Sequence, residues 1–195
     1  MFTGIVTDLG KVRSVEAGED ARFEFETGYD MTAVEIGASI ACSGACLTVT
    51  EKGEGWFAAT VSGETLRVTT LGRWTEGTPV NFERPLRADD ELGGHMVLGH
   101  VDGVGEILSV TPVSDSACFR IRVPDGLKRY VAQKGSVTVD GVSLTVNEAG
   151  GDWFEVNIIP HTRSVTTFGT RKKGDLVNLE IDLLARYVAR LLGKE

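Results

Sequence analysis

The chain contains one phrase twice, and this repeat limits its fold more than any other feature. The stretch "CSGACLTVT" at 42–50 recurs 97 residues later as "VDGVSLTVN" at 139–147. A shift of 97 residues aligns 37–86 with 134–183, and 19 of these 50 pairs are identical. Solenoid repeats have much shorter periods. The sequence therefore predicts two copies of one small domain, joined near 88–96.

Each copy has the patterning of β-structure. The stretches "ARFEFETG" and "ACFRIRVP" alternate apolar and polar residues, as half-buried strands do. "CLTVTEKGEGWFAATV" and its repeat "SLTVNEAGGDWFEVNII" each indicate a strand, a glycine turn and a strand. About six short strands per copy favour a small closed antiparallel barrel, which leaves no strand edge exposed. Within the copies, only 28–37, 62–69, 123–135 and 160–167 have helical character.

The end of the chain departs from the duplication. "IDLLARYVARLL" at 181–192 places five apolar residues on one helical face, namely Leu184, Tyr187, Val188, Leu191 and Leu192. A helix this short is marginal alone in water, so its apolar stripe must pack against something. The spacing favours neither of two partners, which are the chain's own barrels and other copies of the same chain.

Composition and charge exclude several classes of function. The formal net charge is −8, which argues against a nucleic-acid groove because phosphate binding requires a basic face. No stretch approaches the roughly 20 apolar residues of a membrane helix, and the start lacks the pattern of a secretion signal. Three cysteines form no even disulfide framework. We expect a protein of the reducing cytoplasm.

Cys46 and Ser143 occupy the same position in the two copies of the phrase. Residue types alone leave three interpretations of Cys46 open: a metal or redox cysteine, a core cysteine of a duplicated barrel, or a site residue that differs between the halves. A thiol and a hydroxyl differ in nucleophilicity and acidity. His95 and His100 lack a third ligand in register, so we expect no metal here and expect His95 to be structural.

Six stretches in order resemble the two-barrel riboflavin synthases: "MFTGIV", "SGACLTVT", "GETLRVTTLG", "GGHMVLGHVDGVG", "DGVSLTVN" and "IIPHT". The stretches lie between residues 1 and 162, and the resemblance as a whole runs in order from the first residue to about 190. The resemblance implies an all-β fold of two tandem six-stranded antiparallel Greek-key barrels and a C-terminal helix. It also implies an N-terminal lumazine-binding barrel at 1–95, a C-terminal one at 96–181, and a trimerisation helix at 182–195.

The same resemblance implies an activity and an assembly. The reaction is a dismutation in which one 6,7-dimethyl-8-ribityllumazine passes a four-carbon unit to another, giving riboflavin and 5-amino-6-ribitylamino-uracil. No cofactor or metal is expected. The site is expected between the N-terminal barrel of one subunit and the C-terminal barrel of its neighbour in a homotrimer. Lumazine synthase is a candidate partner, whereas nucleic acid and membrane are not expected.

The resemblance carries site residues onto matching positions of this chain. The expected catalytic residues are Cys46, His100, Ser143 and Asp182. The expected substrate contacts in the first repeat are Gly4, Ile5, Val6, Cys46, Leu47, Thr48, Thr60, Val61, Ser62, Gly63, Glu64 and Thr65. Those in the second repeat are Gly99, His100, Val101, Lys134, Ser143, Leu144, Thr145, Asn157, Ile158, Ile159, Pro160, His161 and Thr162.

Other interpretations of these residues stay open. Asp182 could instead be a carboxylate favoured by a helix N-terminus, and Phe2 could be either a core residue or a site residue. The whole chain could be a non-catalytic binder, since the lumazine proteins of luminous bacteria resemble this enzyme and hold a chromophore without turnover. It could also be an interaction module without a ligand. Site-residue matches in both halves favour the enzyme over these two.

Overall fold

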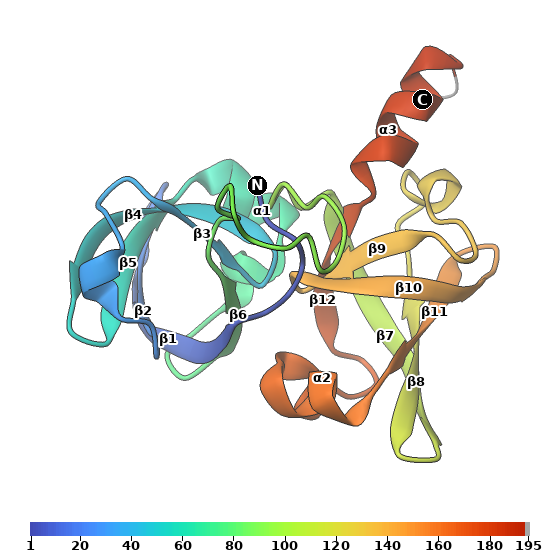
Figure 1. Ribbon diagram of the computed structural model, residues 1–195, viewed down its shortest axis with the longest axis horizontal. Helices are drawn as coiled ribbons and strands as arrows, with labels where there is room; N and C mark the ends of the chain where they lie inside the picture. Colours follow the sequence, from blue (N-terminus) through green and yellow to red (C-terminus); the bar gives the residue numbers. More distant parts are fainter. Residues whose placement is uncertain (194–195) are drawn as a thin grey trace.

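A computed structural model, described for residues 1–193, contains two β-barrels side by side (Figure 1). The strands of the first barrel are β1 (Asp8–Glu16), β2 (Ala21–Glu26), β3 (Ser39–Cys42), β4 (Ala45–Gly53), β5 (Trp56–Val61) and β6 (Pro79–Glu83). Those of the second are β7 (Gly103–Val113), β8 (Ser116–Arg122), β9 (Ser136–Val139), β10 (Val142–Ala149), β11 (Trp153–Ile158) and β12 (Leu176–Ile181).

Both barrels are closed and antiparallel, with the same connectivity. The strand order is β1-β2-β5-β4-β3-β6 in the first barrel and β10-β11-β8-β7-β12-β9 in the second. When six is subtracted from each strand number of the second barrel, its circular order is that of the first barrel, read in the opposite direction. The connections from β2 to β3 and from β5 to β6 skip neighbours, which makes the pattern a Greek key. The predicted all-β class with two six-stranded barrels is confirmed.

Helical segments are short, and the predicted segments contain α-helices or 3₁₀ turns. The segments at 28–37 and 123–135 contain only single 3₁₀ turns, η1 (Met31–Ala33) and η3 (Lys128–Tyr130). After β5 and β11 come α1 (Gly63–Val68) with η2 (Thr70–Arg73), and α2 (Pro160–Val165) with η4 (Thr167–Gly169). Of these, η2 and most of η4 follow the predicted ranges 62–69 and 160–167. The last described helix is α3 (Leu183–Leu191), and residues 194–195 of the predicted helix 182–195 lie outside the described residues. Among the described residues, no helix is long and apolar enough to cross a membrane.

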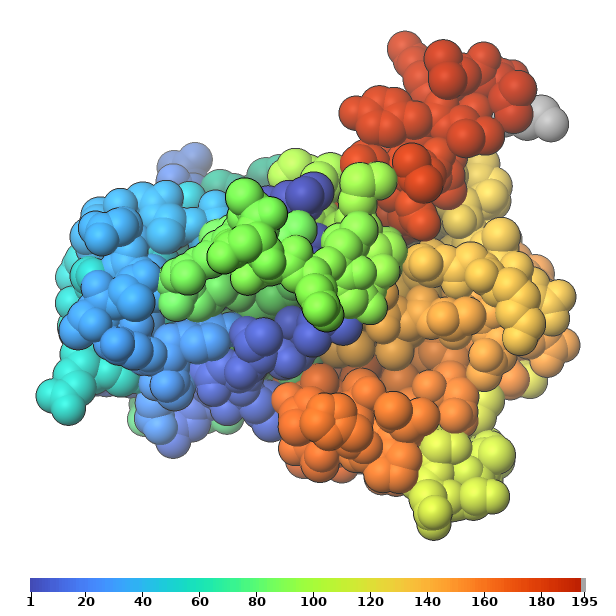
Figure 2. Space-filling model, in the orientation of Figure 1, coloured from blue at the N-terminus to red at the C-terminus, as the bar shows by residue number. Residues whose placement is uncertain are grey.

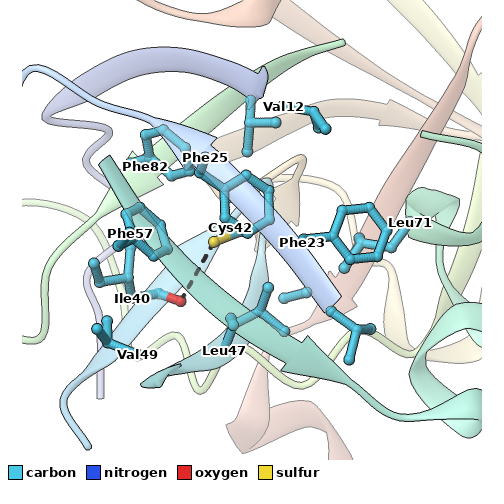
Figure 3. Packing of buried hydrophobic residues seen from close by; sticks show 14 of the residues in the cluster. Val12, Phe23, Phe25, Ile40, Cys42, Leu47, Val49, Phe57, Leu71 and Phe82 are labelled. Carbon is cyan, nitrogen blue, oxygen red and sulfur yellow. Dashed lines mark hydrogen bonds between the residues drawn. The ribbon is translucent and has the colours of Figure 1, made fainter. Parts of the chain in front are cut away.

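The first barrel has an aromatic core (Figure 3). The rings of Phe25 and Phe82 meet edge to face with centroids 5.8 Å apart, and the rings of Phe25 and Phe57 lie 5.1 Å apart. Cys42 is completely buried among them, and its thiol lies 3.7 Å from the carbonyl of Ile40. Cys42 is therefore a core residue.

Reciprocal hydrogen bonds join the two barrels. The side-chain amide of Asn81 donates to the carbonyl of Asp140 at 2.8 Å, and that of Asn178 donates to the carbonyl of Ser43 at 2.8 Å. Asn81 and Asn178 are equivalent in the repeat, since they differ by the same 97 residues. The barrels therefore pack with approximate twofold symmetry, and each supplies the same polar contact to the other.

The helix α3 stands clear of the second barrel (Figures 1 and 2). Its apolar residues face outward, and Leu191 is 86% exposed. At its start the Asp182 carboxylate accepts a hydrogen bond from the amide of Leu184 at 2.9 Å, so Asp182 is the N-cap of the helix. Arg186 forms an ion pair with Asp102, which ties the first turn of α3 to the second barrel.

Candidate functional site

The two segments that open the repeats pair with each other, and each then lies against the barrel of the other repeat. Phe2 and Val97 form an antiparallel bridge, with amide-to-carbonyl distances of 2.7 and 3.1 Å. Beyond this bridge the carbonyl of Gly4 accepts a hydrogen bond from the amide of Ser143 at 2.8 Å. The carbonyl of Gly99 accepts one from the amide of Cys46, also at 2.8 Å. Each repeated phrase is thus paired with the opening segment of the other repeat.

This exchange extends to the hydrophobic packing. Val6 belongs to the first repeat but packs against the core of the second barrel. Val101 belongs to the second repeat but packs against the core of the first. The sequence assigned Gly4–Val6 and Gly99–Val101 to their own repeats, but the structure places each beside the opposite barrel. The reason is the bridge between Phe2 and Val97, which directs the two segments past one another.

Glycine is required at both crossing points. Gly4 and Gly99 each have φ of +78°, a conformation that residues with a side chain rarely adopt. A Cβ atom at Gly4 would lie 2.5 Å from the Cβ of Ser143, and one at Gly99 would lie 2.6 Å from the Cβ of Cys46. Any larger residue would therefore force the opening segment away from the residue that it contacts.

A buried carboxylate fixes each opening segment. Glu83 accepts hydrogen bonds from the amides of Thr3 and Gly4 at 2.6 and 2.9 Å. Its repeat equivalent, Glu180, accepts them from the amides of Gly99 and His100 at 2.9 and 3.0 Å. Burial raises the pKa of both carboxyls, and these amide donors oppose that effect. The two glutamates therefore act as equivalent anchors for the opening segments.

Strand alternation divides the predicted contact residues of each barrel between its outside and its core, so Leu47, Val61 and Ile158 lie in the cores and not on the outward faces. In the first barrel Leu47, Val49 and Val61 are buried in the core, whereas Cys46, Thr48 and Thr60 point outward. In the second barrel Val146 and Ile158 are buried, whereas Ser143, Thr145 and Asn157 point outward. In the first barrel the outward residues come from β4 and β5, which are paired through Val49 and Ala59. In the second barrel they come from β10 and β11, which are paired through Val146 and Val156. The outward residues of each barrel therefore lie on neighbouring strands.

The structure thus forms two equivalent candidate sites, one on each barrel. We call the outward residues Cys46, Thr48 and Thr60, together with Gly99–Val101, the first site. We call Ser143, Thr145 and Asn157, together with Gly4–Val6, the second site. The predicted contacts at 62–65 and 159–162 follow the outward strands into α1 and α2.

Lys134 has a strained backbone at the edge of the second barrel. Its φ is +66°, and its amide donates to the carbonyl of Val146 at 2.8 Å. The equivalent residue, Gly37, has φ of +89° and donates to Val49 in the same way. Lys134 thus adopts a backbone conformation that favours glycine, which makes the backbone strained there. Strain of this kind is common at functional positions. Its side chain is exposed, which fits the predicted contact with a ligand.

His100 lines a cavity between the second barrel and α3. The cavity has a volume of about 420 Å³, and its lining includes Asp102, Glu180 and Tyr187. A related cavity of about 570 Å³ lies at the equivalent place on the first barrel, where Ile5 replaces His100. Asp182 does not line the cavity of His100, because its carboxylate caps α3.

His95 contacts Ser143 of the second candidate site, a contact that the sequence did not predict. Its Nδ1 lies 2.7 Å from the hydroxyl of Ser143, and its Nε2 lies 3.2 Å from the hydroxyl of Thr138. Burial lowers the pKa of His95, and the negative charge of Asp182 opposes this. The available sequence signal was the glycine pair before it, since Gly94 allows the close approach to Ser143.

Cys46 has different surroundings from Ser143. It is half-buried and packs against a small apolar cluster of Phe2, Ala41 and Val97. Phe2 is fully buried in that cluster, so it is both a core residue and a neighbour of the first site. In the part of the chain that the structure describes, no group of three or more His, Cys, Asp and Glu residues could hold a metal ion.

These features define a protein with two equivalent barrel domains and two equivalent candidate sites in one chain. The family model described as "Lumazine binding domain" matches residues 3–85 and 98–182, once for each barrel. The chain belongs to the riboflavin synthase family.

Individual relatives agree with that assignment. The chain is 51% identical to the riboflavin synthase of Brucella abortus over 98% of both chains. It is 38% identical to that of Bacillus subtilis over 100% of this chain and 91% of the relative. Among solved structures, LumP complexed with riboflavin has a TM-score of 0.86 at 26% identity, covering 93% of this chain and 99% of that one.

Proposed function

We propose that this protein is a riboflavin synthase that converts two molecules of 6,7-dimethyl-8-ribityllumazine into riboflavin and 5-amino-6-ribitylamino-uracil. One lumazine donates a four-carbon unit and the other accepts it. The family membership supports the enzyme name, and the duplicated site supports the stoichiometry of two substrates. Riboflavin synthases act as transferases, because the four-carbon unit passes between two molecules of the same compound.

The observation that carries this proposal is the pair of equivalent sites with different polar groups. The first site offers the thiol of Cys46, and the second offers the hydroxyl of Ser143 at the matching position. A reaction between two identical molecules needs two similar pockets, yet donor and acceptor need different chemistry. Holding two reactants in the correct geometry can itself contribute on the order of 7–11 kcal/mol to catalysis. Two barrels of one fold with divergent centres satisfy both requirements.

The chemistry begins with loss of a proton from the C7 methyl group of one lumazine. That methyl is conjugated to an electron-poor ring, so the resulting anion is delocalised. His100 is the proposed base or relay, since an imidazole can exchange protons near neutral pH. It is exposed on its cavity, where a substrate from solution can reach it. Asp182 caps α3, and its negative charge acts on His95 rather than in the cavity of His100, so its place in the proposed catalytic set comes from the resemblance.

The proposed active form is a homotrimer in which the first site of one subunit faces the second site of its neighbour. The exposed apolar stripe of α3 supports this assembly, because such a stripe gains stability by packing against other copies. All three cysteines are free thiols, which supports a reducing, cytoplasmic location. Association with lumazine synthase stays a prediction from the resemblance.

One experiment separates the enzyme from a non-catalytic binder. Purified protein is mixed with 6,7-dimethyl-8-ribityllumazine, and visible absorbance is followed over time. The enzyme accumulates riboflavin, with one riboflavin formed for every two lumazines consumed. A shifted lumazine spectrum without riboflavin would instead show a binding protein. An unchanged spectrum would show that neither site takes this ligand.

A further inference from the structure

We propose that His95 is a positioning residue for the second site, where it holds the Ser143 hydroxyl oxygen in one place for the ligand. This inference rests on the proposed function, because it gives His95 a part in the same reaction. It differs from the expectation that His95 is a structural residue of the linker.

The imidazole of His95 bridges two hydroxyls on neighbouring strands. Ser143 on β10 and Thr138 on β9 are direct partners in the strand register. The ring lies across this pair, with Nδ1 2.7 Å from the Ser143 hydroxyl and Nε2 3.2 Å from the Thr138 hydroxyl. Thr138 is almost completely buried and Ser143 is half-buried, so the line of contacts runs from the barrel outward to the site.

The backbone around His95 is fixed by the first repeat. The amide of His95 donates to the carbonyl of Thr3 at 3.1 Å, and the hydroxyl of Thr3 donates to the buried Glu83 at 2.8 Å. A Cβ atom at Gly94 would lie 2.0 Å from the Thr3 carbonyl oxygen and 2.8 Å from the Cβ of Ser143. Glycine at position 94 therefore lets the linker pass closely enough for the ring to reach Ser143.

This arrangement restricts a group that is otherwise free to rotate. A serine hydroxyl can donate in several directions, whereas a neutral imidazole has one donor and one acceptor nitrogen. Because burial lowers the pKa of His95, the neutral ring is favoured at neutral pH, although Asp182 opposes this. The ring then sets the position and direction of the Ser143 hydroxyl before the ligand arrives, which is the form of preorganisation that lowers a reaction barrier.

The first site has a different arrangement at the matching position. Cys46 packs against the apolar cluster of Phe2, Ala41 and Val97. The two sites therefore differ in the support of the polar group as well as in the group itself. We infer that the oriented hydroxyl distinguishes the lumazine bound at the second site from the one bound at the first.

A double-mutant cycle tests the role of His95. His95→Leu should lower kcat about tenfold, the size expected for one lost hydrogen bond, with little change in KM. In a Ser143→Ala background the same His95→Leu change should have almost no effect, because the group that His95 positions is gone. An equal loss in both backgrounds would show that His95 supports only the fold, and would overturn the proposal.

Two conservative variants provide a matched comparison. The amide of His95→Asn reaches approximately the place of Nδ1 and can still contact Ser143. The longer amide of His95→Gln reaches approximately the place of Nε2 and contacts Thr138 instead. The asparagine variant should therefore retain a larger share of the wild-type kcat than the glutamine variant. Circular dichroism should show that both variants are folded. The opposite order would contradict a role exerted through Ser143.

A spectroscopic measurement separates this inference from the proposed function. In protein labelled with ¹⁵N-histidine, Ser143→Ala should shift the Nδ1 resonance of His95, because that nitrogen loses its hydrogen-bond partner. An unchanged Nδ1 resonance would overturn the contact and the inference with it, whatever the activity. A wild-type protein without riboflavin formation would overturn the proposed function, while the resonance would still test whether His95 holds Ser143.

Discussion

The backbone amide of Cys46 donates a hydrogen bond to the carbonyl of Gly99, 2.8 Å away, across the boundary between the two repeats. The same bond recurs between the amide of Ser143 and the carbonyl of Gly4. Each candidate site is therefore built from one barrel and from the opening segment of the other repeat. The two halves of the chain are interdependent, although each closes its own barrel.

An isolated first barrel should need a second copy of itself. A fragment of residues 1–95 lacks Gly99–Val101, the segment that completes the first site in the full chain. Gly4–Val6 of another fragment is the repeat equivalent and can replace it. We expect the fragment to dimerise and to bind lumazine in its dimeric form, as sedimentation and lumazine fluorescence titration can show. Tight binding by a strictly monomeric fragment would contradict the crossing as a requirement for the site.

Replacement of Cys46 should reduce activity more than stability. Cys46→Ala removes a half-buried sulfur, which should cost about 1 kcal/mol of unfolding free energy or somewhat more, and should lower turnover strongly. Cys46→Ser should retain more turnover than the alanine variant, because the second site has a serine at that position. Riboflavin formation and denaturant unfolding measure the two effects.

Cys42 is the matched control for that comparison. It lies on the adjoining strand β3 and is buried in the core. Cys42→Ala should destabilise the protein at least as much as Cys46→Ala while leaving turnover near the wild-type rate. If Cys46→Ala retained wild-type turnover, Cys46 would be a packing residue like Cys42.

His100→Gln should separate proton transfer from binding. Glutamine keeps a similar size and a hydrogen-bonding group, so riboflavin affinity should be preserved while turnover falls by about 10²-fold or more. Exchange of the C7-methyl protons of lumazine in deuterated buffer, followed by NMR, measures the first step. Exchange at the full wild-type enzymatic rate would show that another group is the base. A parallel fall of affinity and turnover would indicate a residue that only lines the pocket.

The helix α3 should be required for assembly and, through assembly, for catalysis. Truncation after Leu183 removes the exposed stripe and should give monomers with little turnover. Leu184→Glu combined with Val188→Glu should do the same while leaving the barrels folded, because both side chains are exposed. Val113→Glu, at the distant end of β7, is the control and should remain assembled. A truncated monomer with normal turnover at low concentration would contradict a site shared between subunits.

Glu180 should produce a measurable pH dependence of stability. Its carboxyl is buried, which raises its pKa above the value in the unfolded chain, so the folded state binds the proton more tightly. The stability from this group is therefore fully present below the unfolded pKa and is lost as pH rises through the folded pKa. The difference in unfolding free energy between the wild type and Glu180→Gln should fall as pH rises through that window.

The control for this measurement is Glu76→Gln, which changes an exposed carboxyl in a turn. Glu76→Gln also removes one carboxyl charge, so comparison with it separates the effect of the buried position of Glu180 from the loss of a charge alone. The opposite result would be an unfolding free energy of the wild type that increases with pH relative to that of Glu180→Gln. It would mean that the hydrogen bonds from the amides of Gly99 and His100 outweigh the cost of burying the carboxylate.

The sequence by itself determined the duplication, the barrel class and most of the outward residues of the sites. Alternation with a period of two follows from strand geometry, so "CLTVT" alone decides that Cys46 and Thr48 share one face and Leu47 the other. The spacing of α3 likewise decided which of its residues form an apolar stripe. These properties are local, because each depends on neighbouring residues along one element.

Only the tertiary structure decided which opening segment completes which site. Gly4–Val6 and Gly99–Val101 are so alike that the sequence matches either one to either barrel, and the choice depends on the bridge between Phe2 and Val97. The contact of His95 with Ser143 joins residues 48 positions apart and follows no periodic pattern. Such contacts arise from the packing of one barrel on the other, which no segment of the chain encodes alone.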